Sequence, residues 1–342
     1  NKGVIFMHMA DALVSPPVAT GMAVASLAVG AYSIFKIKKE NKPENIPVMG
    51  VMGAFVFATQ MVNFTIPGTG SSGHLCGGLL LSALIGPYGG FLSMMAILLL
   101  QCLLFADGGL MAYGCNVWNM AFYACFFGYF CIYKPILDKN PSKKKILIAS
   151  ILGSVLSLQL GAFSVTLETL ISGVTELPFL TFLSFMQPIH LAIGFVEGLI
   201  TSAVLIFVYN TRPEMLNLNE KSNEFSFKKV IAILGIVTVL IGGGISLLAS
   251  SSPDGLEWSM ENVAGSTELD SKGSAYDKAS EIQEKTALLP DYSISNSNNE
   301  ILGTSFSGIV GSVLVAVILI GGSLIFRFYK KGAKNEQTRK SS

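Results

Sequence analysis

Long apolar segments constrain this chain more than any other feature of its sequence. A helix needs about 20 apolar residues to cross a bilayer. A longer apolar region, 75–133, is interrupted by GPYGG (86–90) and DGG (107–109). Only 13% of the residues are charged, against roughly 25% in soluble domains. The sequence therefore predicts an all-α polytopic integral membrane protein. The other segments of sufficient length are 17–36, 47–66, 145–170, 189–209, 229–250 and 303–327.

The distribution of charge predicts the number and direction of the crossings. Basic residues gather in four stretches, whereas 251–300 holds ten acidic residues and three lysines. Because cytoplasmic loops are enriched in Lys and Arg, we expect the basic stretches inside and 251–300 outside. Region 75–133 must then cross either once or three times. Three crossings, near 75–86, 90–105 and 113–133, give a bundle of about seven helices, two additional C-terminal transmembrane helices and an extracellular N-terminus. The basic stretches are 36–42, 134–145, 212–229 and 327–340.

Two of the three histidines lie in stretches that do not read as membrane helices. His8 belongs to MHMADALVSPP (7–17), where an acid and a proline pair precede the first apolar segment. His74 follows the flexible, polar GTGSSG (68–73) and opens a Gly-rich apolar stretch. Non-helical backbone at membrane depth persists only where protein or a water-filled cavity covers it. We interpret the second stretch as a re-entrant loop with His74 at its tip; the alternative is a histidine in a solvent-exposed loop.

The two histidines could form a metal site on the extracellular side. If Met7 is the first residue of the mature chain, its amine and the amide and imidazole nitrogens of His8 can chelate one ion. His74 would supply the fourth nitrogen. Four nitrogens in a plane suit Ni(II) or Cu(II), whereas zinc prefers a tetrahedron. Residues 1–6 precede Met7, and we interpret them as an upstream extension of the reading frame.

Ionisable groups within the membrane are costly, and they are functional candidates for that reason. Asp11 could orient the N-terminal stretch or cap the first helix. His190 and Glu197 are seven residues apart and so share a helix face, about 10 Å from each other; they line an ion path or form a packing pair. Two amides near the end of the second helix could hydrogen-bond His74. The candidates around the metal or along an ion path are Asp11, Gln60, Asn63, Asp107, His190 and Glu197.

Three motifs resemble those of a known family. MHMADALVSPP (7–17), NFTIPGTGSSGHLCGG (63–78) and LLFADGGLMAYGCNVWNMA (103–121) are similar to the signatures of the CbiM/NikM substrate-specific components of energy-coupling-factor transporters for cobalt and nickel. The resemblance covers about residues 7–210, with the motifs in the same order. SSPDGLEWSMENV (251–263), which lies between two hydrophobic helices, resembles a fused auxiliary region of the NikN or PDGLE type.

The resemblance implies a function and a set of ligands. In that family the metal is held by the N-terminal amine, the amide and imidazole of the second residue, and a histidine on the loop after the second helix. Carried over, these are Met7, His8 and His74. The implied protein imports Ni²⁺ or Co²⁺ as its substrate, without an organic cofactor. It works with a membrane-embedded coupling component and cytoplasmic ATPase subunits in the plasma membrane of a prokaryote, and it binds no nucleic acid.

The motifs and the charge pattern also predict a domain organisation. We expect an N-terminal extension, a metal-binding membrane component, a cytoplasmic linker, and a two-helix auxiliary region whose extracellular loop spans 251–302, followed by a basic cytoplasmic tail. These parts cover residues 1–6, 7–210, 211–228, 229–327 and 328–342, respectively.

Other function classes lack their sequence motifs. No HExxH motif of a metalloprotease and no GxxxxGK[ST] phosphate-binding loop occurs, so the chain is predicted not to be an enzyme. The alternative that remains is a secondary transporter driven by an ion gradient, with Asp107, Glu168 and Glu197 as proton or sodium groups. The residues also leave nickel and cobalt as alternative substrates.

Overall fold

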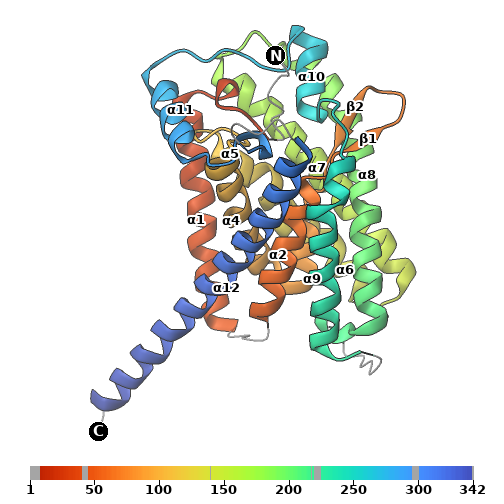
Figure 1. The fold of residues 1–342 in the computed structure, drawn as a ribbon, viewed down its shortest axis with the longest axis vertical. Coiled ribbons are helices and arrows are strands. Elements are labelled where there is room, and N and C mark those ends of the chain that lie inside the picture. The colour runs from red at the N-terminus through yellow and green to blue at the C-terminus, as the bar shows by residue number, and fades with distance from the viewer. Residues whose placement is uncertain are drawn as a thin grey trace.

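The computed structural model describes residues 8–40, 45–138, 140–216, 218, 225–294 and 300–340. Met7 and the extension 1–6 lie outside these ranges. The helices form an upright bundle, and short helices and a hairpin cover one of its ends (Figure 1). Within these described ranges, six helices are long and apolar enough to cross a membrane. The predicted all-α polytopic fold is confirmed.

The long helices follow the apolar segments of the sequence. Residues 113–137 form one continuous helix made of α5 (Tyr113–Asn116), the π-helix η2 (Val117–Tyr133) and α6 (Lys134–Leu137). The other long helices are α1 (Pro16–Glu40), α2 (Asn45–Gln60), α4 (Pro87–Phe105), α7 (Lys143–Ser172), α8 (Phe179–Thr211), α9 (Phe227–Gly243) and α12 (Glu300–Lys340).

The segment between α2 and α4 is the irregular part of the bundle. The hairpin of β1 (Phe64–Ile66) and β2 (Ser71–Gly73) is followed by an extended stretch and by α3 (Gly78–Ile85). Eight residues of helix span about 12 Å, less than half of a hydrocarbon core of about 30 Å. Where the sequence predicts a short crossing near 75–86, the structure has the end of the extended stretch and a helix of eight residues, α3.

Two other predicted boundaries differ from the structure for local reasons. Helix α2 ends at Gln60 rather than near 66, because residues 64–66 pair with residues 71–73. Helix α8 begins at Phe179, ten residues before the predicted start at 189, and it contains Pro188 in its interior. Membrane helices tolerate an internal proline where neighbouring groups satisfy the freed backbone. The proline therefore does not mark the start of this helix.

The two C-terminal helices are part of the bundle, because α9 and α12 both pack on α2. Glycines permit these close approaches. A Cβ atom on Gly308 of α12 would lie 2.0 Å from the carbonyl oxygen of Gly242 in α9, and one on Gly53 of α2 would lie 2.2 Å from the Leu319 side chain. Small residues at such crossings let helix backbones come near each other in a membrane.

The polar chain between α9 and α12 folds over one end of the bundle (Figure 1). It contains α10 (Gly255–Ala264), α11 (Ser274–Thr286) and the 3₁₀-helix η5 (Pro290–Tyr292). Helix α10 starts with a capping box, in which Asp254 accepts backbone N–H groups and the Glu257 side chain accepts the N–H of Asp254. Such a box satisfies N–H groups that the helix itself cannot pair. The predicted loop 251–302 thus holds a structured cover.

Candidate metal centre

The N-terminal segment that carries His8 is fixed to the bundle through its main chain. Asn116 binds both sides of the next residue: its Oδ1 accepts the N–H of Met9 at 2.9 Å, and its Nδ2 donates to the Met9 carbonyl at 3.0 Å. Asp11 lies in the 3₁₀-helix η1 (Asp11–Leu13), and its Oδ1 accepts the N–H of Ala112 at 2.9 Å. These bonds hold the backbone around His8 against the loop that precedes α5.

The imidazole of His8 is buried and only one of its nitrogens has a partner. Nδ1 lies 2.8 Å from Oδ1 of Asp107, and the other carboxylate oxygen of Asp107 accepts the hydroxyl of Tyr292 at 2.6 Å. Nε2 has no hydrogen-bond partner within the described residues, although His8 is only 4% exposed. Leaving such a group unpaired costs about 1–3 kcal/mol. Metal-binding histidines commonly donate their second nitrogen to a carboxylate, so the surroundings of His8 suit a ligand.

The loop that carries His74 is held by polar side chains from α2 and α8. Glu197 accepts the N–H groups of Cys76 and Gly77, each at 3.1 Å and each on a different carboxylate oxygen. Gln60 donates to the carbonyl of Cys76 at 2.8 Å. The non-helical backbone beside His74 thereby finds partners inside the protein, as backbone at membrane depth requires.

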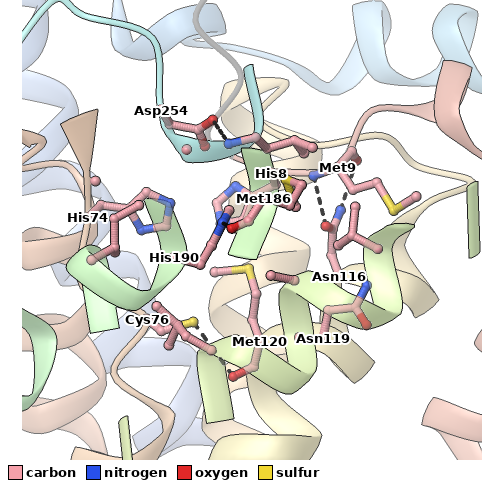
Figure 2. A pocket seen from close by; sticks show the side chains of 18 residues that line it. His8, Met9, His74, Cys76, Asn116, Asn119, Met120, Met186, His190 and Asp254 are labelled. Atoms are coloured by element: carbon pink, nitrogen blue, oxygen red, sulfur yellow. Dashed lines mark hydrogen bonds between the residues drawn. The ribbon is translucent and has the colours of Figure 1, made fainter. Parts of the chain in front are cut away.

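The two loops bring the side chains of His8 and His74 to the same cavity, which has a volume of about 90 Å³. Their ring centroids are 5.6 Å apart, with the planes inclined at 55°. His190 of α8 also lines the cavity, so that all three histidines of the chain gather there (Figure 2). A cavity holds one water molecule in about 10–15 Å³ of this kind of space. The cavity therefore has room for an ion together with its ligands.

The roof of this cavity comes from the C-terminal region. Asp254, which precedes α10, is 5% exposed and lines the cavity together with Gly255 and Leu256 (Figure 2). Burial raises the pKa of the Asp254 carboxyl, and the nearby imidazoles of His74 and His8 lower it. A Cβ atom on Gly255 would lie 3.0 Å from Cε1 of His190. The segment thus packs directly on His190 and closes the cavity that the three histidines line.

The side-chain donors of the cavity do not by themselves complete a metal site. Among residues 8–40, 45–138, 140–216, 218, 225–294 and 300–340, no group of three or more His, Cys, Asp or Glu side chains is placed to hold an ion. The imidazoles of His8 and His74 are suitable ligands for nickel, copper or zinc. Met7, whose amine was predicted as a further ligand, lies outside the described residues.

Gln60 and Asn63 have surroundings that differ from the expectation, and Asp11 fits one of its two predicted roles, the positioning of the N-terminal stretch. Gln60 and Asn63 do not hydrogen-bond His74 in the part of the chain that the structure describes. Gln60 donates to the carbonyl of Cys76, two residues after His74, and its Oε1 accepts a hydrogen bond from Nε2 of Gln101. Oδ1 of Asn63 is buried and has no hydrogen-bond partner among the described residues. Asp11 does not cap the first helix, because α1 begins only at Pro16.

His190 and Glu197 have separate surroundings despite their shared helix. Nδ1 of His190 lies 2.8 Å from the carbonyl oxygen of Met186, and its ring faces the cavity. Glu197, by contrast, is occupied with the backbone of the His74 loop. Glu168, a candidate for a proton or sodium site, accepts Nδ2 of Asn119 at 2.8 Å.

Three residues of the site do not follow from the sequence reasoning. Asn116 fixes the segment of His8, Tyr292 contacts Asp107, and Asp254 lines the cavity. Asn116 belongs to the motif 103–121, and its closeness in the sequence to DGG (107–109) is a signal that could have identified it. Asp254 lies in the PDGLE motif, which was assigned only to the auxiliary region. Tyr292 has no signal in the sequence.

Comparison with known proteins identifies the family of the chain. Residues 8–215 match the family model described as CbiM, cobalt uptake substrate-specific transmembrane region. The chain belongs to this family. A second model, the PDGLE domain, matches residues 228–328 of this CbiM-family protein.

Relatives of known name support the same assignment. The putative fused nickel transport protein NikMN of Archaeoglobus fulgidus is 33% identical over 91% of this chain and 96% of its own length. The cobalt transport protein CbiM of Acetoanaerobium sticklandii is 32% identical over 65% of this chain and 89% of its own length. A crystal structure of a truncated transition metal transporter is 29% identical, with a TM-score of 0.52, and covers 59% of this chain and 98% of that one. These relatives are transport proteins and not enzymes, and nickel or cobalt is the transported substrate.

Proposed function

We propose that this chain is the substrate-binding membrane component of an energy-coupling-factor importer for Ni²⁺ or Co²⁺. The observation that carries the proposal is the pairing of the His8 and His74 imidazoles across a buried cavity that His190 also lines. Imidazoles are suitable ligands of transition metal ions, and all three histidines of the chain line this cavity. The nickel and cobalt transport proteins among its relatives support this choice of ions.

The proposed ligands are the Met7 amine, the His8 amide and imidazole, and the His74 imidazole. Two side chains cannot complete a site alone, and a chain that starts at Met7 supplies the missing donors from its own backbone. The chelate uses Nδ1 of His8, because this nitrogen closes a six-membered ring with the amide nitrogen and the metal. Nδ1 lies against Asp107 in the structure, so chelation requires the imidazole to turn about its Cβ–Cγ bond.

The charge pattern supports an orientation and a set of partners. Lysines at the end of α1 and at the start of α9 lie at the end of the bundle opposite the cavity (Figure 1). We place these lysines in the cytoplasm of a prokaryotic cell, and the N-terminus and the cavity outside. The sequence has no phosphate-binding loop, so the energy comes from ATPase subunits and a coupling component.

The orientation is tested by thiol labelling. A cysteine replacing Ser271 should react with an impermeant thiol reagent in intact cells, and one replacing Ser226 only after lysis; the reverse pattern would refute this orientation.

The ligand set is tested with two forms of the chain, one beginning at Met7 and one that keeps residues 1–6. Both are purified in the same detergent and titrated with Ni²⁺ and Co²⁺. We expect tight binding and a planar d–d absorption band only from the chain beginning at Met7, and loss of both in its His74→Ala variant. The amine must lose its proton to bind the metal. Metal affinity should therefore decrease at pH values below the usual pKa of the amine, about 8. Equal binding by both forms would exclude the chelate.

A gradient-driven carrier is distinguished by its energy source. The acidic residues considered for that role already bind protein groups: Glu168 binds Asn119, Glu197 binds the His74 loop, and Asp107 binds His8 and Tyr292. Metal uptake into proteoliposomes is measured with and without the ATPase and coupling subunits. We expect uptake only with these subunits and ATP. Uptake driven by an ion gradient alone would refute the importer model.

A further inference from the structure

The segment before α10 is attached to the loop that carries His74. The N–H of Ser72 donates to the carbonyl of Pro253 at 2.8 Å, and the Ser72 hydroxyl donates to the carbonyl of Ser252 at the same distance. Nε1 of Trp258 donates to the carbonyl of Thr69 at 3.0 Å. These bonds place Asp254 next to His74, although 180 residues separate the two in the sequence.

The Asp254 carboxylate serves the helix cap with one of its oxygens. Oδ1 accepts the N–H groups of Leu256 and Glu257, both at 2.8 Å. The other oxygen takes no part in this cap. The side chain is buried and lies at the edge of the cavity, near the rings of His8 and His74 (Figure 2). A capping role alone does not account for a buried carboxylate at this edge, because an uncharged Asn or Ser caps a helix about equally well.

The charges around the cavity are unequal. Asp254 is the only acidic side chain among the described residues that line it; the Asp107 carboxylate lies outside this lining, bound to Nδ1 of His8 and to the hydroxyl of Tyr292. Three neutral nitrogens and one deprotonated amide leave a bound divalent ion with a net charge of +1. The N-terminus of α10 adds about half a positive charge, which the same carboxylate faces. An isolated charge in a buried site is strongly disfavoured unless an opposite charge accompanies it.

We propose that Asp254 is the counter-charge of the metal centre, contributed by the C-terminal region to ligands that all come from the N-terminal one. This inference rests on the function proposed above. The carboxylate acts through the electrostatic field and through the closure of the cavity, and it favours divalent cations over neutral occupants. The metal centre is then complete only when residues 252–257 sit on the His74 loop.

The test replaces the charge and keeps the helix cap. Asp254→Asn is nearly isosteric and Asp254→Ser is smaller, and both remain good N-caps. In the chain beginning at Met7, each should lower the affinity for Ni²⁺ and Co²⁺ by about 10–100-fold, the usual range for residues around metal ligands. The unfolding temperature without metal should not fall, because the cap is kept and a buried charge is removed. The control is Glu257→Gln, which removes a carboxylate of the same capping box that does not line this cavity; it should bind metal as the parent does.

The outcomes separate this inference from the proposed function. If the parent binds metal, His74→Ala does not, and both Asp254 variants bind as the parent does, Asp254 is not the counter-charge and the proposed function stands. If Glu257→Gln loses as much affinity as Asp254→Asn, the effect belongs to the helix and the inference is also overturned. If the parent itself binds neither metal, the proposed function fails.

Discussion

Replacing Gly109 with alanine should disturb the metal centre through the backbone of its N-terminal segment. A Cβ atom at this position would lie 1.9 Å from Oδ1 and 2.4 Å from the main-chain nitrogen of Asp11. Turning the Asp11 side chain relieves only the first contact. Since ordinary contact begins at 3.4 Å, the main chain at Asp11 must recede from 2.4 to 3.4 Å, by about 1.0 Å.

A displacement of this size exceeds what the site tolerates. The shift also disturbs the adjoining bond in which the N–H of Gly109 donates to the carbonyl of Met9 at 3.0 Å, and Met9 is next to His8 in the chain. Metal–ligand distances are usually held within about 0.2 Å. We therefore expect Gly109→Ala to lower metal affinity at least 10–100-fold, as changes around metal ligands do. Overpacking should also lower the free energy of unfolding by about 1–3 kcal/mol.

The assay is calorimetric titration with Ni²⁺ of the purified chain beginning at Met7, together with thermal unfolding without metal. Gly21→Ala is the matched control, because it adds the same methyl group to neighbouring α1 with no atom within 4 Å. It should leave both quantities unchanged. If Gly109→Ala binds nickel as tightly as Gly21→Ala, the position of the N-terminal segment does not determine affinity, and the reasoning is wrong.

Three further predictions concern other parts of the structure. Glu197→Gln replaces one acceptor with a donor and leaves one N–H of the His74 loop unpaired, so unfolding should become easier by about 1–3 kcal/mol and nickel titration should show weaker binding; unchanged values would contradict this role. Gly308→Ala should destabilise the crossing of α9 and α12 by about 1–3 kcal/mol in thermal unfolding, whereas Gly321→Ala, with no atom within 4 Å, should not. Burial, and then the charges of Asp107 and Glu268, raise the pKa of Asp291, so its ionised form disfavours folding. Asp291→Asn should therefore stabilise the protein at pH 7 by about 0.5 kcal/mol, a value typical of screened charges. The gain should disappear as the pH falls through the raised pKa towards 3.8; a gain that persists in acid would show another cause.

The sequence predicted the membrane fold well because its strongest signals are local. Helices such as α1 and α7 follow apolar runs that begin or end at a basic stretch, and the bilayer fixes the length of such runs. Prediction from local sequence is less accurate at a proline or in a glycine-rich stretch. Pro188 lies inside α8 rather than before it, and Gly68–Gly78 forms a hairpin and an extended stretch whose geometry depends on Glu197 and Gln60.

The paired histidines were also predictable, since His8 and His74 both stand in non-helical stretches on the same side of the membrane. The rest of the site depends on contacts that have no periodicity and span long stretches of sequence. Hydrogen bonds from Ser72 to the backbone of Ser252 and Pro253 place Asp254 at the cavity. No property of the sequence 251–300 predicts these bonds. The acidic composition of this stretch predicted only the side of the membrane. The sequence alone does not distinguish Asn116 from a packing residue, because a buried amide can serve either purpose.

Both segments that carry histidines are bonded to the C-terminal region: Ser72 donates to the carbonyl of Pro253, and the hydroxyl of Tyr276 donates to the carbonyl of Val14. On separate polypeptides, these few bonds would have to form at whatever concentration the two partners reach in the membrane. A covalent connection through residues 211–228 makes the encounter intramolecular, with an effective concentration on the order of millimolar. Every copy of the N-terminal region is then made with its own cover, in a ratio that no difference in expression can alter.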